Sequence, residues 1–359
     1  MSFDPNKPFE LPNLPPELSQ EELFAPDIVQ LLIKANSGLA ELNGTCRAIN
    51  NPYILLNIPI LQESVASSEI EGIHTTIETA LEDQVKSESE QDPSSKEALR
   101  YREAINEGLK SLETYSLSTR TILSIHKKLI PEKGGEFKKQ QNKIAKGTTV
   151  VYTPPAPTSV NSLMSNWENY VHSSEVEVDP LIKAAISHYQ FEAIHPFADG
   201  NGRTGRILMV LQMVLEKLLD LPILYVSGYL TRNRDSYYSL LSGVTERQEW
   251  IEFIKFMLMA INEQARTTQI VIFKIMGERN KLKKRLREEF KSIYSPDLLD
   301  HIFSFPVTYP TFMGERLNIA YQTASKYLST LESVGILRKR KVGRNVLYYN
   351  IALLSCLRT

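Results

Sequence analysis

Apolar residues recur at helical spacing along most of the chain, which predicts a mainly α-helical protein. One segment differs, because Ile144, Val150 and Tyr152 flank Gly147 and so predict a β-hairpin. Residues 1–26 contain six Pro and show no periodicity, which is typical of an extended arm. The predicted helices span 27–41, 60–71, 94–114, 118–130, 159–172, 180–193, 203–219, 229–242 and 246–276.

Local signals place the helix boundaries. Asp179-Pro180 joins an N-cap to a Pro at the first helical position, and Thr75 opens a capping box. Asn43-Gly44 and Gly72 predict the ends of the first two helices. The helix at 203–219 is apolar on nearly every side, so we expect it to be buried at the centre of the fold.

Length and composition are those of an ordinary globular protein. The 359 residues suffice for two or three domains, and 42% of them are apolar and 23% charged. No apolar run is long enough to span a membrane, and the first residues lack the pattern of a secretory signal. Cys46 and Cys356 lie far apart without metal-ligand spacing, and such scarce free thiols predict a cytoplasmic protein.

Charge is unevenly distributed, although the net charge is only −1. Residues 278–359 contain 15 Lys and Arg against 7 Asp and Glu, which suggests a separate partner for this part. It begins with a basic connector, 277–295, for which a plain charged helix is the alternative. The elements predicted after it are helices at 297–304, 311–318 and 321–334 and a basic hairpin over 338–349.

This order of elements predicts a winged helix-turn-helix over 296–359. The second of the paired helices would enter a DNA groove, which assigns base contacts to Gln322, Thr323 and Lys326. Basic residues of the hairpin would contact phosphates. Winged helices also bind proteins, and a basic surface can be merely solvated, so a role in DNA binding stays one of several alternatives.

Residues 195–206, His-Pro-Phe-Ala-Asp-Gly-Asn-Gly-Arg-Thr-Gly-Arg, concentrate groups that bind phosphate. Three Gly allow close backbone approach and lead directly into the buried helix, whose first N–H groups lack partners and favour anions. Arg203 and Arg206 add cationic donors. The segment therefore predicts a phosphate cradle, and it differs from a P-loop because no Gly-Lys-Ser/Thr follows.

Two further side chains of this segment supply chemistry. Asp199 is a candidate ligand for Mg²⁺, which takes one or two carboxylates together with phosphate oxygens. His195 stands where it can accept a proton from an attacking hydroxyl. Taken singly, a His is usually structural, Gly-Asn-Gly is usually a turn, and two Arg on a helix are usually solvated. Their combination at a helix start favours a site for phosphoryl-type transfer.

The segment resembles the Fic motif, His-x-Phe-x-Asp/Glu-Gly-Asn-Gly-Arg-x-x-Arg, at every defined position. The motif is long and specific. The similarity extends to 183–188, to Tyr237-Tyr238 and to Trp250, and covers roughly residues 20–275. The resemblance implies a Fic-type helical bundle with a β-hairpin flap, and the chain adds a C-terminal winged helix-turn-helix.

The resemblance also implies the reaction, in which ATP with Mg²⁺ donates AMP to a Ser, Thr or Tyr hydroxyl of a target protein. His195 would deprotonate that hydroxyl, and Asp199 would hold Mg²⁺ on the α- and β-phosphates. Phe197 would pack under the loop. Asn201 and neighbouring N–H groups would stabilise the α-phosphate, and Arg206 would grip the γ-phosphate. The full phosphate-binding set is Gly200, Asn201, Gly202, Arg203, Gly205 and Arg206.

The hairpin corresponds to the family's flap, which would hold a target segment by edge pairing. Many relatives carry Arg just before the flap, where this chain has Lys138, which keeps the charge but loses the fork. Core packing is an equal alternative for each Tyr on the adenine side. The flap residues are Gly147, Thr148, Val150 and Tyr152, and the adenine-side residues are Tyr229, Asn233, Tyr237 and Tyr238.

Residues 67–72, Ser-Ser-Glu-Ile-Glu-Gly, resemble the family's inhibitory motif, Ser/Thr-x-x-x-Glu-Gly/Asn. Ser67 and Glu71 share one helix face, and a carboxylate in the last turn opposes the helix dipole by roughly a few tenths of a kcal/mol. The resemblance implies that Glu71 occupies Arg206 and blocks the γ-phosphate. The alternative is a solvated Glu before Gly72, which stops the helix. In some relatives the same Glu helps remove AMP.

We therefore expect a protein adenylyltransferase that is autoinhibited by Glu71. The open alternatives are a DNA-binding transcriptional regulator with a sensory Fic core, removal of AMP, and transfer from another nucleotide donor. We also expect a homo-oligomer, as a dimer, and no membrane association. The predicted domains are an N-terminal arm and helical region at 1–114 with the inhibitory helix at 60–72, a Fic core at 115–276, the connector at 277–295 and the winged helix at 296–359.

Overall fold

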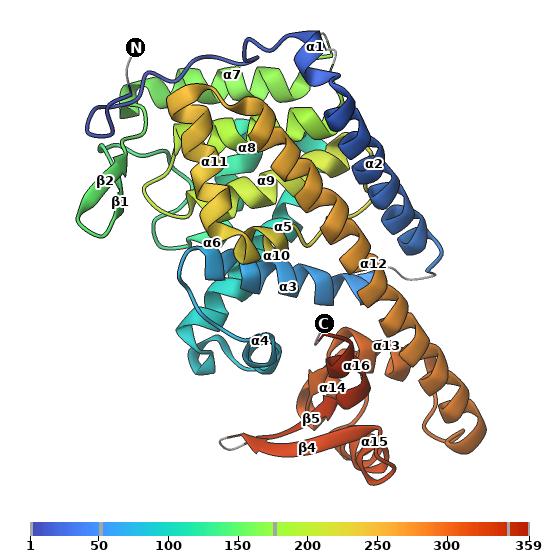
Figure 1. Ribbon diagram of the computed structural model, residues 1–359. Coiled ribbons are helices and arrows are strands. Elements are labelled where there is room, and N and C mark those ends of the chain that lie inside the picture. The colour runs from blue at the N-terminus through green and yellow to red at the C-terminus, as the bar shows by residue number, and fades with distance from the viewer. Residues whose placement is uncertain (1–2, 50–52, 175–177, 343–344, 358–359) are drawn as a thin grey trace.

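The computed structural model describes residues 3–49, 53–174, 178–342 and 345–357. In these ranges the chain is mainly helical, with a hairpin and a small antiparallel sheet (Figure 1). None of the helices described is long and apolar enough to cross a membrane. The helices are α1 (Gln20–Leu23), α2 (Pro26–Arg47), α3 (Tyr53–Ile70), α4 (Ile77–Asp83), α5 (Pro93–Tyr115), α6 (Thr119–Leu129), α7 (Val160–His172), α8 (Pro180–Ile194), α9 (Asn201–Leu215), α10 (Ser227–Arg232), α11 (Arg234–Arg247), α12 (Trp250–Glu289), α13 (Pro296–Ser304), α14 (Pro310–Leu317), α15 (Tyr321–Ser333) and α16 (Ile351–Cys356). The strands are β1 (Ile144–Lys146), β2 (Thr149–Tyr152), β3 (Val307–Thr308), β4 (Leu337–Val342) and β5 (Asn345–Asn350).

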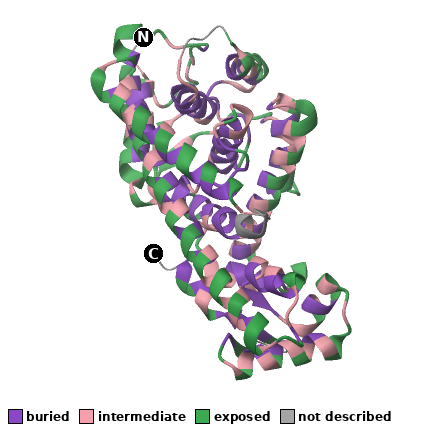
Figure 2. Ribbon diagram, turned by 90° about the vertical axis from the view of Figure 1, so that its right-hand side faces the viewer, coloured by how far each residue is buried: buried purple, intermediate pink, exposed green. Residues whose placement is uncertain are grey.

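Helices α8 and α9 form the centre of the bundle. Nearly every position of α8 is buried, including the polar side chains of Ser187, His188 and Gln190. The first thirteen positions of α9 are buried apart from Gly202, as predicted from its all-round apolar pattern. Figure 2 shows this buried interior enclosed by helices whose outer faces are exposed. The loop between α8 and α9 is therefore anchored on two deeply buried helices.

Two long helices frame one side of the bundle. α2 packs along α12, whose 40 residues give it a length of about 60 Å (Figure 1). The second half of α12 runs beyond the bundle to the C-terminal module, residues 296–357. This module has the predicted order of helices followed by a hairpin, with β5 paired between β3 and β4 and a further helix, α16, at its end. Its assignment to the winged helix-turn-helix class stays a prediction.

The C-terminal module packs back onto the N-terminal region. The Asn57 side chain on α3 donates to the Ser304 carbonyl at the end of α13 (3.4 Å). The Tyr349 hydroxyl on β5 donates to the Glu82 carboxylate on α4 (2.7 Å). The module therefore contacts the helices on both sides of Glu71.

Several predicted boundaries were wrong. α2 continues through Asn43-Gly44, because it packs on α12 and Asn43 accepts a hydrogen bond from the Asp220 N–H (3.0 Å) instead of ending the helix. The N-cap of α4 is Thr76 and not Thr75, because Thr76 has the extended backbone from which its hydroxyl accepts the Thr79 N–H (3.1 Å). Tertiary packing and one-residue shifts of register thus override the local signals.

Three other segments also differ from prediction. The helix expected at 229–242 is two helices, broken at Asn233, whose side chain donates to the Tyr229 carbonyl (3.0 Å). The helix that carries the predicted inhibitory motif is longer than expected, since α3 begins at Tyr53. Most of the predicted connector belongs to α12, so its helical alternative is confirmed.

Candidate active site

The predicted phosphate loop joins α8 to α9. His195 ends α8 with φ 48°, and Gly200 precedes α9 with φ 77°, so both ends of the loop have left-handed backbone. Gly adopts this conformation freely, whereas a residue with a side chain, such as His, adopts it less often. Asn201 closes the loop, because its Nδ2 donates to the Phe197 carbonyl (2.9 Å) and its Oδ1 accepts the Phe197 N–H (2.8 Å). Through these two bonds Asn201 shapes the loop.

Phe197 lies fully buried beneath the loop, in the place predicted for it. Its ring stacks on His126, with centroids 3.6 Å apart. His126 donates from Nε2 to the Asp199 carbonyl (2.9 Å) and accepts the Gly135 N–H at Nδ1 (3.1 Å). Burial lowers the pKa of His126, which keeps it in the neutral form that this geometry requires. No sequence motif pointed to His126, although it supports the loop from below.

His195 is prepared to accept a proton. Its Nδ1 lies 3.3 Å from the Glu192 carbonyl, which can only accept, so Nδ1 carries the proton and Nε2 has a free lone pair. Burial lowers the pKa of His195 to about 4, and the charge of Lys138 acts in the same direction. The imidazole is therefore neutral at physiological pH, as a general base must be.

Lys138 supports the same loop with single hydrogen bonds. Its Nζ donates to Asn142 Oδ1 (3.0 Å) and to the Ile194 carbonyl (3.4 Å), and its N–H donates to the Pro196 carbonyl (2.8 Å). Burial lowers the pKa of Lys138 to about 8. Three hydrogen bonds to separate acceptors thus hold the loop in place, although Lys138 lacks the planar guanidinium of an Arg.

Arg206 is fully buried on α9 and is bound to the predicted inhibitory segment. Its Nε donates to Ser67 Oγ (2.8 Å), and its Nη2 donates to the Ser67 carbonyl (2.9 Å) and to Glu71 Oε1 (2.7 Å). A Cβ atom at Gly202 would collide with the Glu71 carboxylate, so the Gly makes this approach feasible. Gly72 ends α3 with φ 81°, as predicted.

The Arg206–Glu71 contact is an ionic pair. Burial opposes ionisation of Glu71, but the Arg206 guanidinium outweighs it and holds the pKa of Glu71 below its usual value. Burial likewise disfavours the charge on Arg206, while Glu71 raises the pKa of that guanidinium. The Arg206 side chain is 1% exposed and the Glu71 side chain 32%, so the carboxylate marks the solvent side of the pair. A carboxylate therefore occupies the guanidinium that the resemblance assigns to a γ-phosphate.

Arg203 and Asp199 lie on the other side of the cradle. Arg203 is buried and donates from Nη1 to Glu97 on α5, a residue that no motif indicated. Asp199 Oδ1 accepts the Gly200 N–H (2.6 Å) and lies 3.8 Å from Arg203 Nη2. The Asp199 side chain is nevertheless 77% exposed and therefore accessible to a cation.

The metal expectation rests on this single carboxylate. No group of three or more His, Cys, Asp or Glu that could hold a metal occurs among the residues the structure describes. Mg²⁺ bound jointly with a nucleotide does not need such a group, because phosphate oxygens and waters complete its shell. An exposed Asp199 beside the N-terminus of α9 fits that kind of binding.

Glu192 is an acid of the site that sequence reasoning missed. It lies on α8, one turn before His195, and its Oε1 is buried without a hydrogen-bond partner. This oxygen packs against Gly205, where an added Cβ would collide with it. Burial raises the pKa of Glu192 to about 7. The site thus holds one ionised carboxylate at Glu71 and a second acid that titrates near neutrality.

The predicted flap is the β1–β2 hairpin. Lys146 pairs with Thr149 and Ala145 with Val150, across a turn in which Gly147 has φ 62° and Thr148 is exposed. At the base of the hairpin the Tyr152 hydroxyl donates to the Ala193 carbonyl (2.7 Å), two residues before His195. The flap is therefore fixed to the helix end that carries the candidate base.

Burial divides the residues predicted to border adenine. Tyr237 is buried, bonded through its hydroxyl to His188 Nε2 (2.8 Å), and packed against Phe256, so the core-packing alternative applies to it. Tyr229 is half-buried against the same Phe ring. Tyr238 is 40% exposed. An adenine contact for Tyr229, Tyr238 and the helix-breaking Asn233 stays a prediction.

The C-terminal module exposes cations, but its hairpin is partly engaged. Gln322 and Lys326 are exposed on α15, and Thr323 is half-buried. All four basic residues of β4 are exposed as well, yet Arg340 Nη1 lies 3.7 Å from the Glu82 carboxylate of α4.

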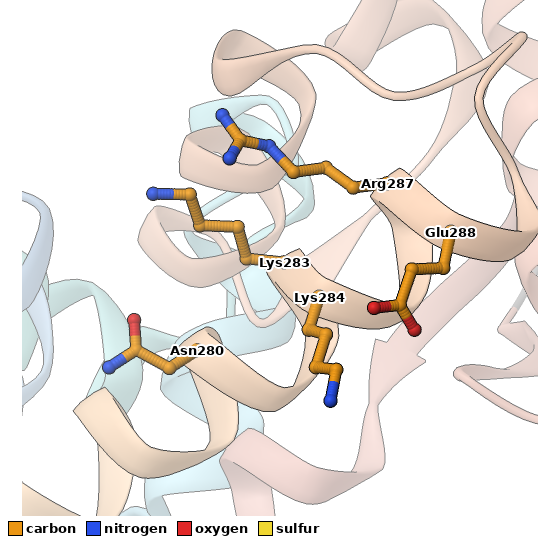
Figure 3. A pocket seen from close by; sticks show the side chains of 5 residues that line it. All are labelled: Asn280, Lys283, Lys284, Arg287 and Glu288. Carbon is orange, nitrogen blue, oxygen red and sulfur yellow. The ribbon is translucent and has the colours of Figure 1, made fainter.

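The neighbouring end of α12 is also basic. Figure 3 shows Lys283 and Arg287 extending from this helix to one side of a pocket that Asn280, Lys284 and Glu288 also line. Nearby cations are paired within the module or the helix, as Arg279 is with Asp300.

Comparison with protein families accounts for most of the chain. The Fic/DOC family N-terminal model matches residues 29–110, and the Fic/DOC family model matches 116–213, which includes the whole loop described above. The chain belongs to the Fic/DOC family. The C-terminal domain of SoFic-like protein adenylyltransferases matches residues 279–353.

Individual relatives of this Fic chain match it over part of its length. A protein adenylyltransferase Fic of Aedes aegypti is 36% identical over 98 residues, 26% of this chain and 19% of its own. The protein adenylyltransferase fic-1 of Caenorhabditis briggsae is 34% identical over 122 residues, 33% of this chain and 22% of its own. The matched part is thus about a fifth of the length of these relatives. A solved Fic family protein from Desulfovibrio desulfuricans superimposes with a TM-score of 0.59 at 18% identity, covering 94% of this chain and 98% of that one, which shows the shared fold.

Proposed function

We propose that this Fic chain is a protein adenylyltransferase that transfers AMP from ATP to a target hydroxyl and is held inactive by Glu71. The observation that carries the proposal is the Glu71 carboxylate seated on Arg206, beside a neutral His195 with a free Nε2. The names of its relatives support the same reaction class. A carboxylate on a buried phosphate-binding Arg is the arrangement expected of a site blocked by its own chain.

The transfer follows from the positions of the side chains. The target hydroxyl oxygen attacks the α-phosphorus of ATP, and His195 Nε2 takes the hydroxyl proton. The bond from the α-phosphorus to the bridging oxygen breaks, and pyrophosphate leaves. Developing charge on the α-phosphate meets the free N–H groups of the first turn of α9 and its helix dipole. The loop is held in place by Asn201, His126 and Lys138, so the donors need little reorganisation.

The remaining groups position the nucleotide. Arg206 would bind the γ-phosphate once Glu71 leaves, and Asp199 would ligate Mg²⁺, which supplies neutralising charge on the phosphates when bound. Arg203 contributes through the loop, because Glu97 already engages its guanidinium. The flap would hold the target segment at its edge, with Ser, Thr or Tyr as the acceptor.

The inhibition is a competition for one guanidinium. While Glu71 and Ser67 occupy Arg206, the γ-phosphate lacks its partner and ATP cannot seat in the productive geometry. The contact with Gly202 adds steric hindrance, because the Glu71 carboxylate lies directly against the backbone that would hold the phosphates. Removing the Glu71 side chain relieves both effects at once.

The test is transfer of label from α-labelled ATP with Mg²⁺ to the chain itself and to host lysate proteins. We expect weak label with the natural chain, strong label with Glu71→Gly, and none with Glu71→Gly combined with His195→Ala. Absence of label in all three, with the fold and ATP binding intact, would overturn the proposal. Parallel reactions with other nucleotide donors, and with AMP-modified protein as substrate, test the alternatives of a different donor and of AMP removal.

A second candidate function is DNA binding by the C-terminal module. It is favoured by the exposed Gln322 and Lys326 on α15 and the exposed cations of β4. Binding through phosphates should weaken steeply as salt rises, and Lys326→Ala should weaken it in a gel shift. A gel shift that persists without residues 278–359 would contradict this function.

A further inference from the structure

The N-terminal arm, residues 3–14, is joined to the flap. The Phe9 N–H donates to the Thr153 carbonyl (2.9 Å), and the Thr153 hydroxyl donates to the Pro5 carbonyl (2.6 Å). The rings of Phe3 and Phe9 both pack against Tyr152, with centroids 6.3 and 5.9 Å away. Figure 1 shows the arm passing the base of the β1–β2 hairpin. An apparently unstructured Pro-rich segment is therefore part of the flap's surroundings.

The arm is also fixed to the bundle, so it does not move freely with the flap. The buried Gln190 on α8 donates to the Pro12 carbonyl (2.7 Å). The Leu14 N–H and carbonyl both bond the Asn166 side chain on α7 (2.7 and 3.1 Å). These bonds hold the arm on α7 and on α8, the helix that ends at His195.

The arm occupies one end of the flap's edge. One edge of β2, the inner edge, pairs with β1 from Thr149 to Tyr152. The opposite edge of β2 is called the outer edge. Immediately beyond that pairing, the Thr153 carbonyl is bonded to Phe9 and not to β1. A target strand added to the outer edge of β2 therefore meets the arm at Thr153 and cannot slide past it.

The same end of the flap is tied to the candidate base. Tyr152, which carries the Phe3 and Phe9 contacts, bonds the Ala193 carbonyl two residues before His195. The separation between the arm and His195 is thus set by a short chain of direct contacts. A strand that abuts the arm presents one particular residue to His195, since a shift by one residue would turn its side chain to the other face.

We propose that the arm sets the register of the target segment and so selects which hydroxyl along it receives AMP. The partner is an extended peptide segment that adds to the outer edge of β2. Its residue nearest the arm is apolar or aromatic, because the half-buried rings of Phe3 and Phe9 offer an apolar surface there. This inference rests on the proposed adenylyl transfer and adds a determinant of target choice outside the Fic loop.

The experiment uses the full chain with Glu71→Gly as the active parent. The first acceptors are short peptides in which a single Ser, Thr or Tyr is moved one position at a time. The second acceptor is a His195→Ala copy of the chain, and mass spectrometry maps which of its hydroxyls are modified. Phe9→Ala removes the ring and keeps the N–H donor, whereas Phe9→Pro removes both. Phe9→Tyr keeps both, and Glu10→Ala changes an exposed neighbour on the arm.

We expect Phe9→Ala and Phe9→Pro to raise the acceptor KM roughly tenfold, the effect of about one lost hydrogen bond or ring contact, and to spread label to neighbouring positions. The KM for ATP and the release of AMP to water should stay within about twofold of the parent, which also shows that the fold is intact. Phe9→Tyr and Glu10→Ala should match the parent. An unchanged position map and acceptor KM in both Phe9 variants would overturn the arm's role. Failure of the parent to label any acceptor would instead overturn the proposed transfer.

Discussion

Replacing Glu71 by Gly should destabilise the chain and, at the same time, make it bind ATP better. Arg206 would keep its two bonds to Ser67 but would lose its only carboxylate partner in the described structure. Loss of one partner from a fully buried pair costs several kcal/mol, and the 32% exposure of Glu71 reduces this to about 1–3 kcal/mol. The melting temperature should therefore fall by roughly 1–4 °C.

MgATP should reverse the loss, because its γ-phosphate supplies the missing anion. A ligand at about 100 times its Kd stabilises by about 2.7 kcal/mol, so the nucleotide-induced rise in melting temperature should be clearly larger in Glu71→Gly than in the natural chain. The assay is thermal unfolding with and without MgATP, made in a His195→Ala background so that no turnover occurs.

Two matched variants separate charge from size and position. Glu71→Gln keeps the size and removes the charge, so it should show an intermediate effect on both readouts. Glu69→Gly changes an exposed Glu in the same last turn of α3 and should leave the ATP response as in the natural chain. If Glu71→Gly melts like the natural chain and responds to MgATP no more strongly, competition for Arg206 is not the basis of inhibition.

Other variants test the rest of the site. Arg206→Ala, added to the Glu71→Gly parent, should reduce label transfer by more than about tenfold. In a chain that already carries Arg206→Ala, adding Glu71→Gly should no longer raise label transfer. Glu97→Ala should cost about 1–2 kcal/mol in urea unfolding, because it removes the carboxylate bonded to the buried Arg203, while the exposure of Glu97 and the nearby Asp199 reduce the loss. Glu192 ionises as the pH rises through its pKa of about 7, which places a second negative charge near the phosphates, so the KM for ATP should rise above that pH. A Glu192→Gln chain mimics the protonated acid, so its KM for ATP should not rise with pH. Initial rates measured between pH 5.5 and 8.5 give this KM.

The part of the site that lies within a contiguous motif was predictable from the sequence. Residue types at fixed spacing predicted the loop and the hairpin, and the resemblance to the family implied the pairing of Glu71 with Arg206 and the position of Phe197 under the loop. The all-round apolar pattern of α9 likewise predicted its central burial.

The part that depends on packing between distant elements was not predictable. Glu97 and His126 occur in ordinary amphipathic helices, and nothing in their neighbours distinguishes them from solvated residues. Asn201, which the resemblance assigns to the α-phosphate, also bonds the loop backbone at Phe197, and this additional contact was not predicted. The arm has no periodicity, because its order comes from single backbone bonds to flap and bundle rather than from a helix or strand of its own.

The order of residues along the chain has a consequence for synthesis. Glu71 precedes Arg206 by 135 residues, and the loop of His195 lies between them. Because a nascent chain emerges from its N-terminus, the carboxylate that occupies Arg206 is outside the ribosome before the guanidinium is made. The catalytic loop can therefore close directly onto a blocked arrangement. The contacts from the C-terminal module, which bracket Glu71 through Asn57 and Glu82, are completed last. On the proposed function, the site would thus be blocked from the moment it forms on the ribosome.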